Sequence, residues 1–163
     1  MSRSALSGNH PALTSLIERM ASLSNGLGIM GRLKLGRSGK KRGRFDLLAH
    51  GLLPLSAALS ALTLINECSA AGNLDRVYDL LERGNLDVNL AERMLATWHQ
   101  LQEFRLDMES FLKTGEYSDQ TLLLEPGKLT VEQREKLKNA LESVAHIQRY
   151  VEHLFSECGE QSA

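Results

Sequence analysis

Cysteine is scarce in this chain of 163 residues, and its apolar runs are short. The two cysteines, Cys68 and Cys158, belong to no CxxC pair and to no metal-ligand spacing. A disulfide framework is therefore not indicated, and a reducing cytoplasm is the expected compartment. The first 25 residues lack the apolar core of a signal peptide. The most apolar run, Leu52 to Ile65, is interrupted by a proline and three hydroxyl side chains, so we expect a buried helix rather than a membrane span.

Acidic residues are almost missing from the first 45 positions, although the net charge of the whole chain is only −1. Residues 1–45 hold nine Lys or Arg and one acid, a local charge of +8. Residues 46–163 hold ten against nineteen, a local charge of −9. The hydrophobic fraction of 42% and the charged fraction of 24% are ordinary for a soluble globular domain. Segregated charge of this kind predicts either two functional surfaces or docking of the first segment on the second.

The N-terminal third predicts a short helix followed by a small β-hairpin. Pro11 suits the first turn of a helix, and an apolar residue every three or four positions continues that helix to about Leu23. Six glycines between residues 26 and 43 exclude a helix interior there. Ile29 to Leu35 and Phe45 to Leu48 are expected as the two strands, with a turn at 36–39 between them.

The remainder of the chain predicts helices with one apolar stripe each. Their expected ranges are 52–72, 73–84, about 87–114, and 130–155, where Thr130 and Gln133 form a capping box. The third and fourth of these have matched lengths, and antiparallel packing buries their stripes most simply. We therefore expect a mostly α fold, an antiparallel up-and-down helical bundle of the four-helix type preceded by the short helix and the hairpin.

Three segments resemble the nucleotidyltransferase substrate-binding domain family. They are the stretch Gly-Arg-Phe-Asp-Leu-Leu-Ala-His-Gly-Leu-Leu-Pro-Leu at 43–55, Leu-Gln-Glu-Phe-Arg-Leu at 101–106, and the capping-box helix start at 129–141. Their order and separations fit that family. Three departures stand out. Leu48 and Ala49 stand where a basic pair is expected, Asp107-Met108-Glu109 stands where a more basic run with a histidine is expected, and the loop 115–129 lacks the expected Asp-Asn-Tyr-like sequence.

The resemblance implies a division of labour. In this family the bundle is similar to the helical domains of kanamycin-type and glutamine-synthetase-regulating nucleotidyltransferases. It usually follows a nucleotidyltransferase domain, often itself preceded by paired CBS sensor modules, in bacterial signalling proteins. Residues 1–45 would then be a basic segment that ends such a catalytic domain, and residues 46–158 the substrate-binding bundle. No cofactor is expected on this chain, whereas a full-length enzyme would use a nucleotide and Mg²⁺. The chain is then expected to be a piece of a longer protein.

Catalytic carboxylates are missing from the place where nucleotidyl transfer would need them. That reaction needs two or three carboxylates to hold Mg²⁺ and a Gly-Ser turn to hold the phosphates. The nearest approach is the turn at 36–39 followed by Asp46, and the position two residues after Asp46 is Leu48. We therefore expect no catalytic residue, no metal site and no enzyme activity in this chain on its own, only as part of a nucleotidyltransferase.

A basic run supplies seven of the eight candidate ligand-binding residues. They are Arg32, Lys34, Arg37, Lys40, Lys41, Arg42 and Arg44, with no acid among residues 32–44. Three interpretations stay open: a solvated hairpin that docks on the acidic bundle, a lining for a nucleotide or phosphoprotein cleft, and a nucleic-acid surface. The lone aromatic Phe45 gives the third little support.

Arg105 is the eighth candidate. It is expected on the apolar stripe with Leu101, Met108 and Leu112, where a charge needs a partner. That partner is either a nearby carboxylate, such as Glu109, or a phosphate in a cleft between the bundle and a catalytic domain.

Two hypotheses follow. The chain is a non-catalytic substrate-binding and regulatory module, which positions an acceptor or nucleotide against a nucleotidyltransferase domain in the same polypeptide or in a partner. Alternatively, it is an interaction bundle without ligand that forms a homodimer through a small-residue surface of Ala57, Ala58 and Ala61. The acceptor would be a protein or a small molecule, and neither a membrane nor nucleic acid is expected as a partner.

Overall fold

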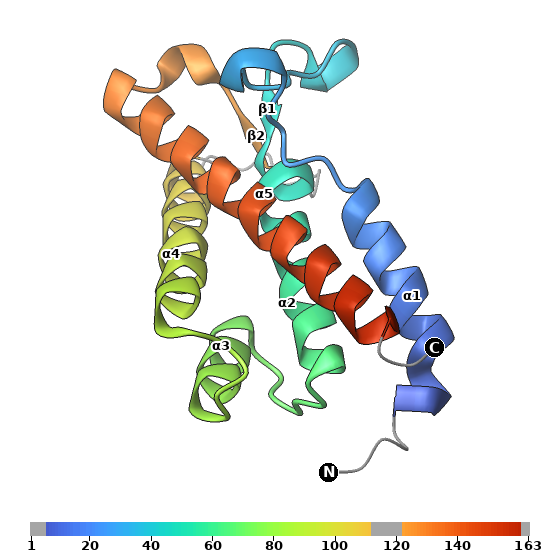
Figure 1. Ribbon diagram of the computed structural model, residues 1–163. Coiled ribbons are helices and arrows are strands. Elements are labelled where there is room, and N and C mark those ends of the chain that lie inside the picture. The colour runs from blue at the N-terminus through green and yellow to red at the C-terminus, as the bar shows by residue number, and fades with distance from the viewer. Residues whose placement is uncertain (1–5, 112–121, 161–163) are drawn as a thin grey trace.

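Five α-helices account for most of the computed structural model, which describes residues 6–111 and 122–160 (Figure 1). They are α1 (Leu6–Ser22), α2 (Leu53–Ile65), α3 (Asn73–Glu82), α4 (Val88–Phe111) and α5 (Val131–Glu160). The four long helices alternate in direction, and α3 forms part of the connection between α2 and α4 (Figure 1). The predicted mostly α fold is confirmed, but α1, which was expected to precede the bundle, packs within it against α2 and α5.

The core lies along α5, which packs against α1, α2 and α4. Its buried residues recur every three or four positions, the spacing that places them on one face of a helix: Leu137, Ala140, Leu141, Val144, Ile147 and Val151. α1 adds Leu13, Ile17 and Met20 to the same core. The predicted division at residue 45, between the end of a catalytic domain and the substrate-binding bundle, stays a prediction.

Local capping fixes where two of the helices begin. The Thr130 hydroxyl accepts the amide hydrogen of Gln133 at 3.1 Å, and the Gln133 side-chain oxygen accepts that of Thr130 at 2.9 Å. This reciprocal pair is the predicted capping box at the start of α5. At α4, Asp87 Oδ1 accepts the Leu90 amide at 2.9 Å, which satisfies one of the amides that a helix start leaves unpaired.

The predicted hairpin strand at Ile29–Leu35 is wrong. Residues 27–33 form a tight turn instead, closed by the Gly28 amide on the Arg32 carbonyl at 2.7 Å. Met30 and Gly31 both have positive φ, 60° and 68°, at its tip, and Met30 is 88% exposed. A strand cannot continue through two such residues, because left-handed backbone reverses the chain.

The second predicted strand has a different partner from the one expected. β1 (Phe45–Asp46) pairs antiparallel with β2 (Leu123–Leu124), with Phe45 opposite Leu124. Phe45 is fully buried, and Leu124 is nearly so. The small sheet therefore joins the segment before α2 to the segment before α5, and this fixes the base of the loop that precedes Phe45.

The apolar segment Leu48–Ile65 is long and apolar enough to cross a membrane by length and composition, in contrast to the prediction from the sequence. Half of that window is buried inside the bundle. It begins with a π-helical turn, Leu48–Leu52, and continues as α2. Ala58 and Ala61 are fully buried there, so the small-residue surface predicted for a homodimer is wrong.

A basic loop and an adjoining pocket

The candidate functional site begins with the basic loop, residues 32–44, between α1 and β1. Its seven predicted cations are all exposed: Arg32, Lys34, Arg37, Lys40, Lys41, Arg42 and Arg44. The loop closes on itself, because the Gly36 amide donates to the Arg44 carbonyl and the Gly43 amide to the Gly36 carbonyl, each at 2.9 Å. A Cβ at residue 36 would lie 2.2 Å from the Lys41 carbonyl oxygen, so only glycine allows this approach.

Asp46 holds one side of this loop. Its carboxylate is buried, accepts the Lys41 ammonium at 2.8 Å and accepts the Ala49 amide at 2.9 Å. Burial raises the pKa of Asp46, but the hydrogen bonds from Lys41 and Ala49 lower it by more. The pKa of Asp46 therefore lies below its usual value. Lys41 is therefore committed to a structural ion pair.

Glu125 holds the other side from the segment after β2. It lies 3.3 Å from Arg44 and 3.0 Å from Lys128. The hydrogen bond and the charge of Lys128, followed by the charge of Arg44, lower the pKa of Glu125. Lys41 and Arg44 thus fix the loop, whereas Arg32, Arg37 and Arg42 present their charge to solvent on a constrained backbone.

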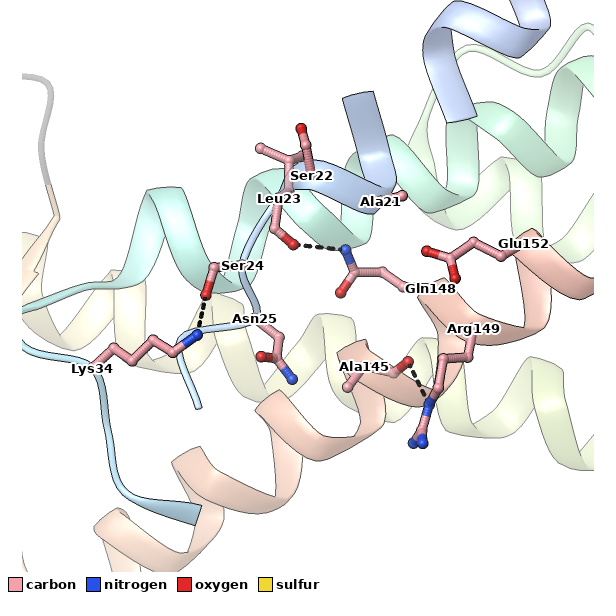
Figure 2. Close-up of a pocket in the computed structure, with 10 residues that line it drawn as sticks. All are labelled: Ala21, Ser22, Leu23, Ser24, Asn25, Lys34, Ala145, Gln148, Arg149 and Glu152. Atoms are coloured by element: carbon pink, nitrogen blue, oxygen red, sulfur yellow. Dashed lines mark hydrogen bonds between the residues drawn. The ribbon is translucent and has the colours of Figure 1, made fainter. Parts of the chain in front are cut away.

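A pocket of about 430 Å³ lies beside the loop, between the end of α1 and α5 (Figure 2). Residues 21–25 form one wall, and Ala145, Gln148, Arg149 and Glu152 of α5 form the other. Lys34 is the one predicted site residue among those that line it. Its ammonium lies 3.1 Å from the Ser24 hydroxyl, so the basic loop and the pocket meet at this side chain.

Gln148 joins the two walls. Its side-chain nitrogen donates to the carbonyls of Met20 at 3.0 Å and Leu23 at 3.1 Å, and its residue is buried. The Leu23 carbonyl lies just past the C-terminal end of α1, and the Met20 carbonyl also accepts the Leu23 amide at 3.0 Å. The amide of Gln148 therefore caps α1 from α5 and sets the width of the pocket.

His50 and Gly26 fix the segment that follows α1. The His50 Nδ1 lies 3.1 Å from the Ser24 carbonyl oxygen, and its ring packs against Phe45 with centroids 5.6 Å apart. Gly26 has φ of +70°, and a Cβ there would lie 2.5 Å from the Phe45 ring. Only glycine lets this segment pass so close to the start of α2.

The position predicted for Arg105 is wrong. The buried positions of this part of α4 are Thr97, Leu101 and Phe104, whereas Arg105 is exposed. Arg105 follows Phe104 by one residue and thus lies about 100° further round the helix. It is also absent from the pocket lining. The side chain of Glu109, named as its partner, lies outside the described residues.

Sequence reasoning missed the α5 wall of the pocket. Gln148 is a buried polar residue among Val144, Ile147 and Val151, and a polar residue at a core position of a helical stripe was the signal that marked it. Arg149 and Glu152 are typical of an exposed helix surface and carried no such signal. Within residues 6–111 and 122–160, no group of three His, Cys, Asp or Glu side chains is placed to hold a metal ion.

Comparison with known proteins assigns this helical module to a family. The model of the putative nucleotidyltransferase substrate binding domain matches residues 11–155, most of the chain. The chain belongs to this family, as the three sequence segments predicted. No curated protein matches it, and neither does any solved structure. The match includes most of α1, the basic loop and both walls of the pocket.

Proposed function

We propose that this chain is a non-catalytic, regulatory module that positions a substrate for a bacterial nucleotidyltransferase of the signalling type. The module would hold an acceptor or a nucleotide against a catalytic domain in the same polypeptide or in a partner. Any Mg²⁺ and the reacting nucleotide would be held by that catalytic domain.

One observation carries this proposal: the basic loop is fixed by ion pairs at both sides, yet it leaves guanidinium groups facing solvent. Lys41 forms an ion pair with Asp46, and Arg44 forms one with Glu125. Guanidinium groups on a backbone that is already held lose side-chain freedom but little backbone freedom when they bind a phosphate or a carboxylate, and they can donate two hydrogen bonds at once, which favours a recognition role.

The test is binding of two probes to the whole chain by isothermal titration calorimetry. The probes are Mg-ATP and the separately expressed catalytic domain of a longer family member. Charge reversal of Arg37 and Arg42 to glutamate together should weaken binding by about tenfold or more, because two charged contacts change sign. Arg93→Glu is the matched control, since this exposed arginine belongs to α4 and not to the basic loop. The N-terminal end of α4 lies at the end of the bundle opposite to β1 (Figure 1).

The proposal fails on a clear result. If neither probe binds, or if the doubly reversed variant binds each probe as tightly as the Arg93→Glu control does, then the basic loop does not position a substrate.

A further inference from the structure

The turn at residues 27–33 carries two apolar side chains at its tip, Ile29 and Met30, which we call the apolar tip. Their exposed fractions are 89% and 88%, higher than that of any other large hydrophobic side chain that the structure describes. The turn is closed by the hydrogen bond described above and by a second one, from the Lys34 amide to the Gly26 carbonyl at 2.7 Å. The fold therefore holds both side chains out in solvent on a fixed backbone.

The stability of the fold does not account for the apolar tip. Met30 has left-handed backbone, with φ of 60°, where a Cβ is strained and glycine is not. Side chains that stay in water when the chain folds also gain no hydrophobic stabilisation. Strained backbone is concentrated at binding and switch regions, so the tip is best explained by a partner that covers it.

Positive charge surrounds the apolar tip. No acidic residue stands between Glu18 and Asp46 in the chain, and the basic loop lies at the same end of the bundle as the tip, the end where β1 is found (Figure 1). Two exposed arginines, Arg32 and Arg42, each follow a short turn at this end, and the two turns lie apart in Figure 1. The charge is therefore distributed over this end of the bundle and not gathered at one point.

An apolar tip within distributed positive charge fits a partner that is anionic at its surface and apolar beneath it. Proteins bind the surface of a bilayer through apolar side chains that enter the boundary between headgroups and acyl chains, and through Lys and Arg beside anionic headgroups. Single-stranded nucleic acid is held by stacking on aromatic side chains, and neither residue of the tip is aromatic. The strongest contacts of protein interfaces are enriched in Trp, Tyr and Arg, whereas the tip offers an isoleucine and a methionine.

We propose that the apolar tip and the basic loop bind the surface of an anionic membrane, with Ile29 and Met30 in the headgroup boundary and the exposed arginines on lipid phosphates. This contact would hold the module at the membrane, a property that goes beyond the proposed function and does not depend on it. The sequence-based expectation of no membrane partner concerned a helix that spans the bilayer, whereas a tip of this kind lies on its surface.

Co-sedimentation of the whole chain with lipid vesicles tests the proposal. Vesicles of phosphatidylcholine with about 30% phosphatidylglycerol supply an anionic surface, and vesicles of phosphatidylcholine alone are the control. We expect binding to the anionic vesicles that weakens at least about tenfold between about 0.1 and 0.5 M salt, because salt screens the charges.

The tip variant, Ile29→Ser with Met30→Ser, should bind the anionic vesicles at least about tenfold more weakly, because its apolar area no longer enters the bilayer. Tyr78→Ser with Val88→Ser is the matched control, since these side chains are also exposed, by 51% and 59%. They belong to α3 and to the start of α4, at the other end of the bundle (Figure 1), and their replacement should leave vesicle binding unchanged.

A tryptophan at the tip measures insertion directly. Ile29→Trp adds a fluorescent reporter to a chain whose single tryptophan is Trp98, in α4. Brominated acyl chains quench a tryptophan that lies close to them, so they should quench the fluorescence of Ile29→Trp more than that of the wild type.

The proposal is overturned if the chain does not bind anionic vesicles at low salt, or if the tip variant binds them as tightly as its control. Equal quenching of Ile29→Trp and the wild type overturns it as well. A tip variant that binds vesicles normally but has lost affinity for the separately expressed catalytic domain would make the tip a protein contact instead. The calorimetric test with Arg37 and Arg42 contains no lipid, so failure of the membrane contact and failure of the proposed function are told apart.

Discussion

Replacing Asp46 by asparagine tests how the basic loop is held. Asparagine keeps the shape of the side chain and an acceptor for the Ala49 amide. It removes the negative charge, however, and places an NH₂ group where the wild-type carboxylate oxygen lies 2.8 Å from the Lys41 ammonium. The Lys41 side chain is 52% exposed, so water screens the ion pair. We therefore expect a loss of about 1–2 kcal/mol in the free energy of unfolding, from a charged hydrogen bond discounted for that exposure. Alanine, which also removes the acceptor for Ala49, should cost about 1 kcal/mol more.

Urea denaturation at several pH values measures this effect. The pKa of Asp46 is lowered in the folded state, so its contribution is complete above the pKa of the unfolded chain, about 3.9, and is lost as the pH falls through the lower folded pKa. The difference between the wild type and Asp46→Asn should thus shrink below about pH 4. Lys41→Met and the double variant complete a mutant cycle that isolates the ion pair. Equal stability of Asp46→Asn and the wild type at pH 7, or a difference that stays constant down to pH 3, would refute the reasoning.

Substitutions at three further positions probe other features. Gly26→Ala should cost more than about 2 kcal/mol by urea denaturation, because the residue has φ of +70° and its Cβ would lie 2.5 Å from Phe45; a smaller cost would mean that the segment can move. Met30→Gly should stabilise the fold by about 0.5–1 kcal/mol, because Met30 has left-handed backbone, where a Cβ is strained and glycine is not, and its side chain is exposed. An unchanged melting temperature would contradict this. Gln148→Leu should destabilise by about 1–2 kcal/mol by urea denaturation, because the Leu23 carbonyl loses the Gln148 donor while the Met20 carbonyl keeps the Leu23 amide. Gln148→Glu tests the need for that donor at constant shape.

Local rules predicted the helices well, although the helix expected over 52–72 ends at Ile65. Each of the long helices has an apolar stripe whose spacing is visible in the sequence, and the capping box at Thr130 and Gln133 depends on residues three positions apart. The error at Arg105 shows the limit of the same rule. A helix turns 100° per residue, so the assignment of a residue at the edge of a stripe is decided by the neighbouring helix and not by spacing.

The sheet could not be predicted from local patterns. Phe45 pairs with Leu124, and nothing within a short window relates these two positions. The predicted strand at 29–35 failed because Met30 and Gly31 take up left-handed backbone, which alternation of apolar residues does not reveal. The basic loop itself was identified from charge alone, whereas the opposite wall of the pocket was not, since it depends on how α5 packs against α1.

The contact between Gln148 and the end of α1 also has a consequence for the order of folding. It joins residues 128 positions apart, whereas α2, α3 and α4 follow one another along the chain and contact as neighbours. A contact that closes a long loop requires a larger loss of chain entropy before it forms, so such contacts tend to form late. The seam between α1 and α5, where Gln148 meets the end of α1, is then expected to form last during folding and to separate first during unfolding. A ligand bound across that seam would hold the folded state by slowing unfolding while leaving the rate of folding almost unchanged.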